Sequence, residues 1–209
     1  MIPAFPVYLF DVDGTLLDSA ADICGAVRDT FSECGIDGLD ESHLRSYIGH
    51  HLFDLFEDVI PGVSQEQKDH LLVRYRAIYA ARGHSSTRPY DGVAEALARI
   101  PGRKSTATTK STQTVRIILG QFGLLSYFEH VQGTDGFPAK PAPDVIYKSL
   151  EALQVRAKDV LLVGDSETDM AAGRAAGVRV CAVQYGYGDI EKMKAFQPDY
   201  WIGHLNELC

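Results

Sequence analysis

Two aspartates follow a short apolar segment near the amino terminus of the chain. Asp11 and Asp13 come directly after residues 7–10, which read Val-Tyr-Leu-Phe, and Gly14 follows them. Because side chains alternate in direction along an extended chain, we expect both carboxylates on one side and the Val12 side chain on the other. Carboxylates can act as nucleophiles or as general acids and bases, so this pair is a candidate for catalysis.

Polar side chains also follow three later segments that have the character of buried strands. They are Thr108 and Thr109 at the end of residues 104–108, Lys140 after residues 129–133, and Asp165 and Asp169 after residues 159–163. In a sheet of parallel strands, ligands bind beyond the carboxyl ends of the strands. These residues are therefore expected to meet Asp11 and Asp13 in one crevice, although they lie far apart in sequence.

The side-chain types in this set are those that phosphoryl transfer requires. The reaction needs a nucleophile in line, a proton donor for the leaving oxygen and positive charge around the other phosphoryl oxygens. We expect Asp11 to attack phosphorus and form an aspartyl-phosphate, and Asp13 to protonate the leaving group and then activate water. Lys140 supplies a fixed positive charge, and Thr108 and Thr109 offer hydroxyl or amide groups to phosphate oxygens.

Four carboxylates in one crevice require a compensating positive charge. Asp11, Asp13, Asp165 and Asp169 would repel one another strongly at neutral pH. A divalent cation removes this repulsion, and Mg²⁺ prefers carboxylate, water and phosphate oxygens as ligands. The sequence therefore predicts Mg²⁺ as the cofactor.

The hydrophobic pattern predicts the elements that hold these residues. Strands are expected over residues 7–10, 104–108, 129–133, 159–163 and 178–183, with an edge strand over 200–202. Helices are expected between them, over residues 91–99, 111–122, 143–153 and 167–176, with a last helical turn over 205–208. This alternation predicts the α/β class, with a doubly wound, Rossmann-like parallel sheet covered by helices on both faces.

A long helical stretch separates the first strand from the second. Residues 20–82 carry helical periodicity throughout, whereas a parallel crossover needs only about a dozen residues. We therefore expect an inserted all-helical domain over residues 17–87, with the α/β core formed by residues 1–16 and 88–209. The connections near residues 15–19 and 83–90 would act as hinges, and Asp18-Ser19 is a helix-start signal.

Composition limits the partners of the chain. The 209 residues carry a net charge of −8 and no run rich in lysine or arginine, which argues against nucleic acid and membrane surfaces as partners. The four cysteines have no CxxC spacing, and neither a signal peptide nor a membrane-spanning apolar run is evident. We expect a cytoplasmic protein with reduced thiols, monomeric or homodimeric, that acts on a small phosphorylated metabolite.

The motifs together resemble those of the haloacid dehalogenase superfamily. The matching residues are Asp11-Val12-Asp13-Gly14-Thr15, Thr108 after a strand, Lys140 in Ala-Lys-Pro-Ala-Pro, and Gly164-Asp165-Ser166-Glu167-Thr168-Asp169. The resemblance implies that Mg²⁺ is held by the Asp11 side chain, the Asp13 backbone carbonyl and the Asp165 side chain. It also implies that Asp169 supports these ligands or replaces one of them. The helical insertion resembles the small cap of this superfamily, which closes over the crevice.

Within the superfamily, the sequence is most similar to phosphoglycolate-phosphatase-like hydrolases. The similarity rests on the Lys-Pro-x-Pro and Gly-Asp-Ser motifs and on Tyr185-Gly186-Tyr187-Gly188 after the last core strand. The resemblance implies a phosphatase for a small phosphomonoester. Two alternatives stay open: a phosphosugar mutase of the same fold, and a non-catalytic module that binds a phosphorylated ligand.

Weaker signals come from the helical insertion and from the second strand end. Arg45, His50 and His51 lie where related caps place a loop that reaches the substrate, although a surface charge and a polar turn would explain them equally well. Thr109 and Lys110 either add backbone contacts beside Thr108 or begin the next helix.

Overall fold

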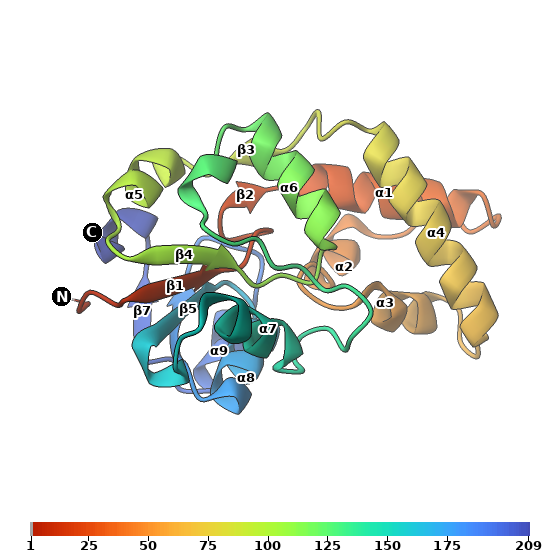
Figure 1. Cartoon of the computed structure of the whole chain (residues 1–209). Coiled ribbons are helices and arrows are strands. Elements are labelled where there is room, and N and C mark those ends of the chain that lie inside the picture. The colour runs from red at the N-terminus through yellow and green to blue at the C-terminus, as the bar shows by residue number, and fades with distance from the viewer. Residues whose placement is uncertain (1) are drawn as a thin grey trace.

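The computed structural model describes residues 2–209 and centres on a five-stranded parallel sheet (Figure 1). The strand order is β4 (Arg103–Thr106), β1 (Val7–Phe10), β5 (Val160–Gly164), β6 (Arg179–Val183) and β7 (Tyr200–Ile202). β1 pairs with both β4 and β5, with Val7 opposite Arg103 on one side and Val160 on the other. The carboxyl ends of β4, β1 and β5 therefore lie side by side, and the predicted α/β class is confirmed.

Helices cover both faces of the sheet because its strand residues alternate between two apolar cores. The covering helices are α5 (Val93–Arg99), α6 (Thr112–Gln121), α7 (Asp144–Leu153), α8 (Glu167–Ala176) and α9 (Ile190–Lys194). Tyr8 and Phe10 pack in one core with residues of α5 and α6, whereas Val7 and Leu9 pack in the other with residues of α7, α8 and α9. All four β1 side chains are fully buried. The doubly wound arrangement is thus confirmed.

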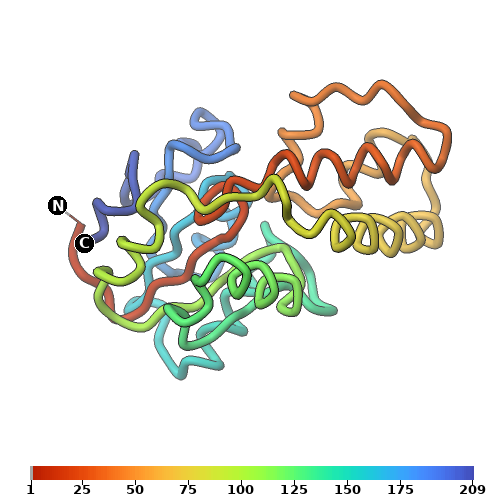
Figure 2. The backbone as a smooth tube through the Cα atoms, turned by 90° about the horizontal axis from the view of Figure 1, so that it is seen from above, coloured from red at the N-terminus to blue at the C-terminus, as the bar shows by residue number. Residues whose placement is uncertain are grey.

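The first four helices form a separate group beside the sheet (Figures 1 and 2). They are α1 (Ala20–Ser32), α2 (Glu41–Ser46), α3 (Leu52–Val59) and α4 (Gln65–Ala81), and we call them the helical insertion. Phe31 of α1 meets Phe56 of α3 edge to face, and both rings are fully buried. The inserted all-helical part is confirmed, whereas its limits at residues 17 and 87 stay a prediction.

The two connections between core and insertion run side by side (Figure 2). β2 (Leu17–Asp18) and β3 (Arg88–Pro89) pair there as a two-stranded antiparallel ladder. The buried Asp22 of α1 also accepts hydrogen bonds from the Ser86 amide at 3.0 Å and the Thr87 hydroxyl at 2.7 Å. The hinges that the sequence predicts are therefore joined to each other.

The predicted strand over residues 129–133 is wrong. In the part of the chain that the structure describes, this segment forms an isolated bridge between Ser105 and His130 and no strand. The Thr106 hydroxyl accepts a hydrogen bond from the Gln132 amide and donates one to the Gln132 carbonyl, both at 2.9 Å. A side chain thus replaces the backbone partner that would have extended the ladder.

Some short elements have no counterpart in the sequence prediction. They are β2, β3, α9 and the 3₁₀ turns η1 (Leu125–Tyr127) and η2 (Ala157–Asp159), whereas η3 (Leu205–Leu208) was expected as a helical turn. α9 begins because the Asp189 carboxylate accepts hydrogen bonds from the Glu191 and Lys192 amides. None of the helices described within residues 2–209 combines the length and the apolar character needed to cross a membrane.

Tyr187, in the loop after β6, caps the first helix of the insertion. Its hydroxyl accepts hydrogen bonds from the Ser19 amide at 2.7 Å and the Ala20 amide at 3.0 Å, and it donates one to Asp18 at 2.7 Å. The helix begins at Ala20, as the sequence predicts, but the Ser19 side chain does not cap it. The Ser19 hydroxyl instead donates a hydrogen bond to Asp13. A core tyrosine therefore fixes the start of the insertion.

We predict that Tyr187→Phe destabilises this junction. The amides of Ser19, which precedes α1, and of Ala20, its first residue, lose their acceptor, so the free energy of unfolding should fall by roughly 1–2 kcal/mol in urea denaturation. Hydrogen exchange at the Ser19 and Ala20 amides should accelerate. Tyr127→Phe is the matched control, because its hydroxyl makes none of these contacts. Equal effects of the two variants would contradict the capping role.

Candidate active site

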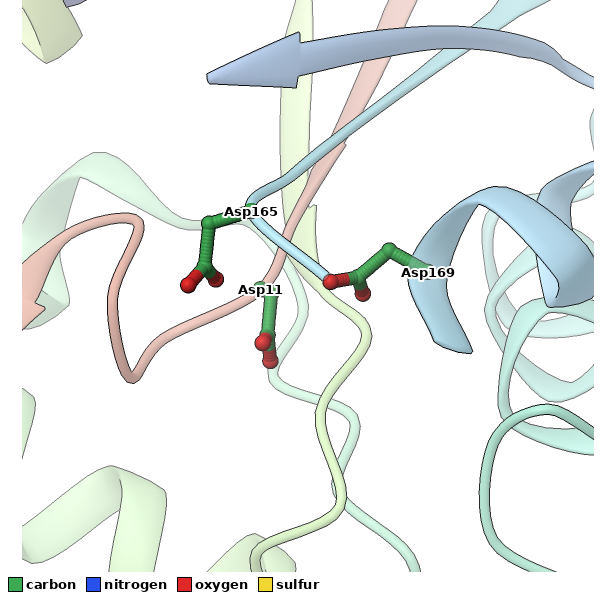
Figure 3. A group of neighbouring side chains, drawn as sticks. All are labelled: Asp11, Asp165 and Asp169. Carbon is green, nitrogen blue, oxygen red and sulfur yellow. The ribbon is translucent and has the colours of Figure 1, made fainter. Parts of the chain in front are cut away.

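Three buried carboxylates gather beyond the ends of β1 and β5 (Figure 3). Asp11 follows β1, Asp165 follows β5, and Asp169 lies in the first turn of α8. One carboxylate oxygen of each lies within 4.8 Å of the others, and we call the three residues the carboxylate cluster. The parallel pairing of β1 with β5 brings Asp11 to Asp165, and the first turn of α8 adds Asp169.

Lys140, which precedes α7, lies against the carboxylate cluster. Its ammonium lies 3.1 Å from Asp11 Oδ1 and 2.5 Å from Asp169 Oδ1, and its side chain is fully buried. Burial acts to lower the pKa of Lys140, but the Asp11 and Asp169 carboxylates outweigh it, so the pKa is raised above its ordinary value. Lys140 is therefore a permanent positive charge beside Asp11.

One lysine does not balance the buried negative charge. Burial raises the pKa of Asp11 to about 6; the Lys140 charge opposes this shift, and Asp169 adds to it. The pKa of Asp165 is raised well above its ordinary value, first by burial and then by its acidic neighbours. Within residues 2–209, Oδ1 of Asp11 also accepts no hydrogen bond, despite its distance of 3.1 Å from the Lys140 ammonium. The cluster therefore holds more negative charge than Lys140 alone balances.

Glycines allow two loops to enclose Asp165. Its Oδ1 accepts a hydrogen bond from the Thr15 hydroxyl at 3.1 Å, and its Oδ2 accepts one from the Tyr187 amide at 2.8 Å. A Cβ atom at Gly14 would lie 2.1 Å from Oδ2, and one at Gly186 would lie 2.4 Å from it. Larger residues at either position would displace the carboxylate.

Both oxygens of Asp169 have protein donors, as both oxygens of Asp165 do. In Asp169, Oδ1 is paired with Lys140, and Oδ2 accepts hydrogen bonds from the Ser166 amide at 3.1 Å and the Ser166 hydroxyl at 2.6 Å. Ser166 and Asp169 thereby form the capping box of α8. These bonds favour a role in holding Lys140 and the loop after β5.

The carboxylate cluster has the donor set of a site for a divalent cation. It offers buried carboxylate oxygens within 4.8 Å of one another, and one of them, on Asp11, has no hydrogen-bond donor among the described residues. A set of ligands made of oxygens alone suits Mg²⁺ or Ca²⁺ better than metals that prefer nitrogen or sulfur.

The threonines at the end of β4 complete the polar edge of the sheet. Thr108 is fully buried, and its hydroxyl has no partner among residues 2–209, so it is available to a bound anion. Thr109 lines a neighbouring cavity. Of the two roles left open for Thr109 and Lys110, the structure excludes the helix start, because α6 is capped by Ser111, whose hydroxyl accepts a hydrogen bond from the Thr114 amide.

Lys110 is the residue of this region that the sequence prediction undervalued. Its ammonium lies 2.9 Å from Asp13 Oδ2, and the Ser19 hydroxyl binds the other oxygen of Asp13. The same ammonium donates a hydrogen bond to the Tyr79 hydroxyl of α4 at 3.0 Å. The signal in the sequence was a lysine two residues after the strand expected over 104–108, next to the strand that precedes the two aspartates.

A cavity of about 320 Å³ lies between the helical insertion and the core, on the Asp13 side of the site. His50 and His51 line it, and their contact with a substrate stays a prediction. His51 also accepts a hydrogen bond from the Phe53 amide at the start of α3. Arg45 is placed elsewhere: its guanidinium lies over the Tyr187 ring, 5.6 Å from the ring centroid.

Comparison with known proteins identifies relatives that match most of this chain. A phosphoglycolate phosphatase from Vibrio parahaemolyticus is 33% identical over 215 residues, covering 95% of this chain and 92% of that protein. One from Nitrosospira multiformis is 34% identical over 190 residues, covering 87% of this chain and 84% of that protein. The structure of a predicted phosphatase from Clostridium acetobutylicum has a TM-score of 0.91 at 28% identity, covering 99% of this chain and 97% of that one.

The family model of the haloacid dehalogenase-like hydrolases matches residues 8–183. This span includes the carboxylate cluster, Lys140 and Thr108. By this match and by the identity with the relatives, the chain belongs to the haloacid dehalogenase-like hydrolase family.

Proposed function

We propose that the protein is a Mg²⁺-dependent phosphatase that hydrolyses a small phosphomonoester, similar to phosphoglycolate, through an aspartyl-phosphate. The observation that carries the proposal is the buried Asp11, which has an oxygen without a hydrogen-bond donor among the described residues and lies against Lys140 and two further acids. The phosphoglycolate phosphatase of Vibrio parahaemolyticus, 33% identical, supports the choice of substrate.

Mg²⁺ would be held by the side chains of Asp11 and Asp165 and the backbone carbonyl of Asp13. When bound, the ion supplies positive charge to the phosphoryl oxygens and relieves the repulsion between the carboxylates. Asp169 would remain paired with Lys140 and Ser166, as its hydrogen bonds favour.

The chain's own residues would carry both steps of the reaction. In the first, a carboxylate oxygen of Asp11 attacks phosphorus, the ester bond to phosphorus breaks, and Asp13 gives its proton to the leaving oxygen. In the second, Asp13 takes a proton from water, which attacks the same phosphorus and releases phosphate from Asp11. Lys140 and the Thr108 hydroxyl would hold the phosphoryl oxygens through both steps.

In this proposal residues 17–87 act as a cap that opens for exchange and closes for chemistry. Several contacts already join the insertion to the core. They are Tyr79–Lys110 at 3.0 Å, the Gly49 carbonyl with the Thr168 hydroxyl at 3.1 Å, His50–Glu167 at 3.5 Å, and Arg45 over the Tyr187 ring. Polar contacts of this kind are individually weak, so closure would be reversible while it excludes bulk water from the site.

Phosphate release from phosphoglycolate tests the proposal directly. The wild-type protein should release phosphate only with Mg²⁺ present, and Asp11→Asn should lower kcat by at least roughly a thousandfold, because the amide is not a nucleophile. Asp159→Asn, in the 3₁₀ turn before β5, is the matched control and should keep full activity.

The same assay separates the rival functions. No phosphate release from phosphoglycolate or p-nitrophenyl phosphate would indicate a binding module, and isomerisation of glucose 1-phosphate without phosphate release would indicate a mutase. Activity in Asp11→Asn within tenfold of the wild type would contradict the nucleophile.

The raised pKa of Asp11 predicts that stabilisation by Mg²⁺ depends on pH. Burial in the first place raises this pKa from 3.8 to about 6, so the folded, metal-free protein holds the proton more tightly than the unfolded chain does. The contribution of Asp11 to stability is therefore complete below about pH 4 and is lost as the pH rises through about 6. Mg²⁺ binds the ionised carboxylate, so it should restore this loss.

Thermal unfolding with and without Mg²⁺ measures this effect. The increase in Tm on adding Mg²⁺ should be larger at pH 7.5 than at pH 5.0, and Asp11→Asn should reduce the difference between the two pH values. An equal increase at both pH values in the wild type would contradict Mg²⁺ binding at Asp11.

A further inference from the structure

Lys110 places a buried positive charge beside Asp13, the residue that in the proposed reaction protonates the leaving group. Its side chain is 10% exposed, and its ammonium lies 4.4 Å from the centroid of the Tyr79 ring. Among residues 2–209, the groups that the ammonium contacts are Asp13 Oδ2 at 2.9 Å and the Tyr79 hydroxyl at 3.0 Å. An ammonium has three N–H donors, so one donor remains for a ligand.

The distance to Asp13 limits which part of a substrate can reach Lys110. A group that protonates the leaving oxygen has to lie within hydrogen-bond distance of it. A carboxylate one carbon away from that oxygen has its own oxygens within about 3 to 4 Å of it, by standard covalent geometry. A carboxylate in this position therefore lies within reach of Lys110, which is 2.9 Å from the same Asp13 oxygen.

The charge of the cavity favours a second anionic group. The chain as a whole has a net charge of −8. Among the described residues, however, Asp13 is the one acidic residue in the wall of the 320 Å³ cavity, whereas two cations, Lys110 and Arg76, line it. A concave surface lined in this way concentrates anions, although the rest of the protein repels them.

We propose that Lys110 determines specificity by binding a carboxylate on the leaving group. The substrates would be phosphate esters of 2-hydroxy acids, with the carboxylate on the carbon that bears the ester oxygen. The inference rests on the proposed phosphatase function and names the substrate class of that site. A cavity of about 320 Å³ also has room for members larger than a two-carbon acid.

Two esters that differ in one group test this role. Phosphoglycolate and 2-hydroxyethyl phosphate have the same phosphate and the same first carbon, but only the former carries a carboxylate. The readout is the ratio of their kcat/KM values, which cancels any effect of a variant on the shared chemistry. The wild-type enzyme should favour phosphoglycolate.

Three variants separate the charge of Lys110 from its structural contacts. Lys110→Gln keeps a hydrogen-bond donor for Asp13 and Tyr79 but removes the charge, and it should lower the ratio by about a hundredfold. Lys110→Arg restores the charge and should recover part of the ratio. Lys148→Met is the matched control on the surface, where the lysine is 54% exposed and pairs with Glu151, and it should leave the ratio unchanged.

The outcomes distinguish this inference from the proposed function. An equal fall in kcat/KM for both esters in Lys110→Gln would overturn the specificity role, because it would show that Lys110 acts only on Asp13 or on folding. A wild-type protein that hydrolyses neither ester would overturn the phosphatase function and the role of Lys110 with it. A wild-type enzyme that hydrolyses both equally well would overturn the carboxylate site alone.

Discussion

The repulsion between buried carboxylates is the constraint on which the rest of the structure depends. Asp11, Asp165 and Asp169 lie within 4.8 Å of one another, and all three are buried. Such an arrangement is unstable unless positive charge lies close to it. Lys140, which lies between Asp11 and Asp169, provides part of that positive charge. A divalent cation would provide the rest. The local excess of negative charge is thus the reason for which we propose a metal at this site.

The fold supports this arrangement through segments that serve two purposes at once. The Tyr187 amide holds Asp165, and the hydroxyl of the same residue caps the first helix of the insertion. Lys110 pairs with Asp13 and at the same time contacts Tyr79 on the last helix of the insertion. Movement of the insertion would therefore change the contacts of both Asp13 and Asp165. This coupling gives a physical reason why closure and chemistry would occur together.

The sequence was sufficient for the features that depend on periodicity and on strand ends. Four-residue apolar runs predicted β1 and β5, and the rule that ligands bind beyond parallel strands predicted that Asp11 and Asp165 lie together. Lys140 joins them although the strand expected before it is not formed. The prediction of a strand over 129–133 was wrong because the Thr106 hydroxyl forms hydrogen bonds with the Gln132 backbone where a strand would have paired. Local sequence does not reveal such a tertiary contact. The sequence did not predict the β2–β3 ladder because a strand of two residues is too short to show an alternation of apolar and polar residues.

The site residues that were missed act through long-range contacts. Tyr187 and Ser19 are 168 residues apart, and nothing in either local sequence marks the hydrogen bond between them. Lys110 follows Thr109, which the sequence already marked as a candidate. Its proximity to Asp13, however, can be seen only from the register of β4 against β1. Sequence patterns locate the catalytic edge of a sheet, whereas the side chains that join it to a second domain need coordinates.

In the proposed reaction, Asp11 itself takes the phosphoryl group. The most direct measurement is rapid acid quenching of the enzyme during turnover of ³²P-labelled phosphoglycolate, followed by peptide mapping. We expect the label on the peptide that contains Asp11, with an acid-stable, hydroxylamine-sensitive linkage typical of an acyl phosphate. Phosphate release with no label on the protein, or with the label on another residue, would contradict the account.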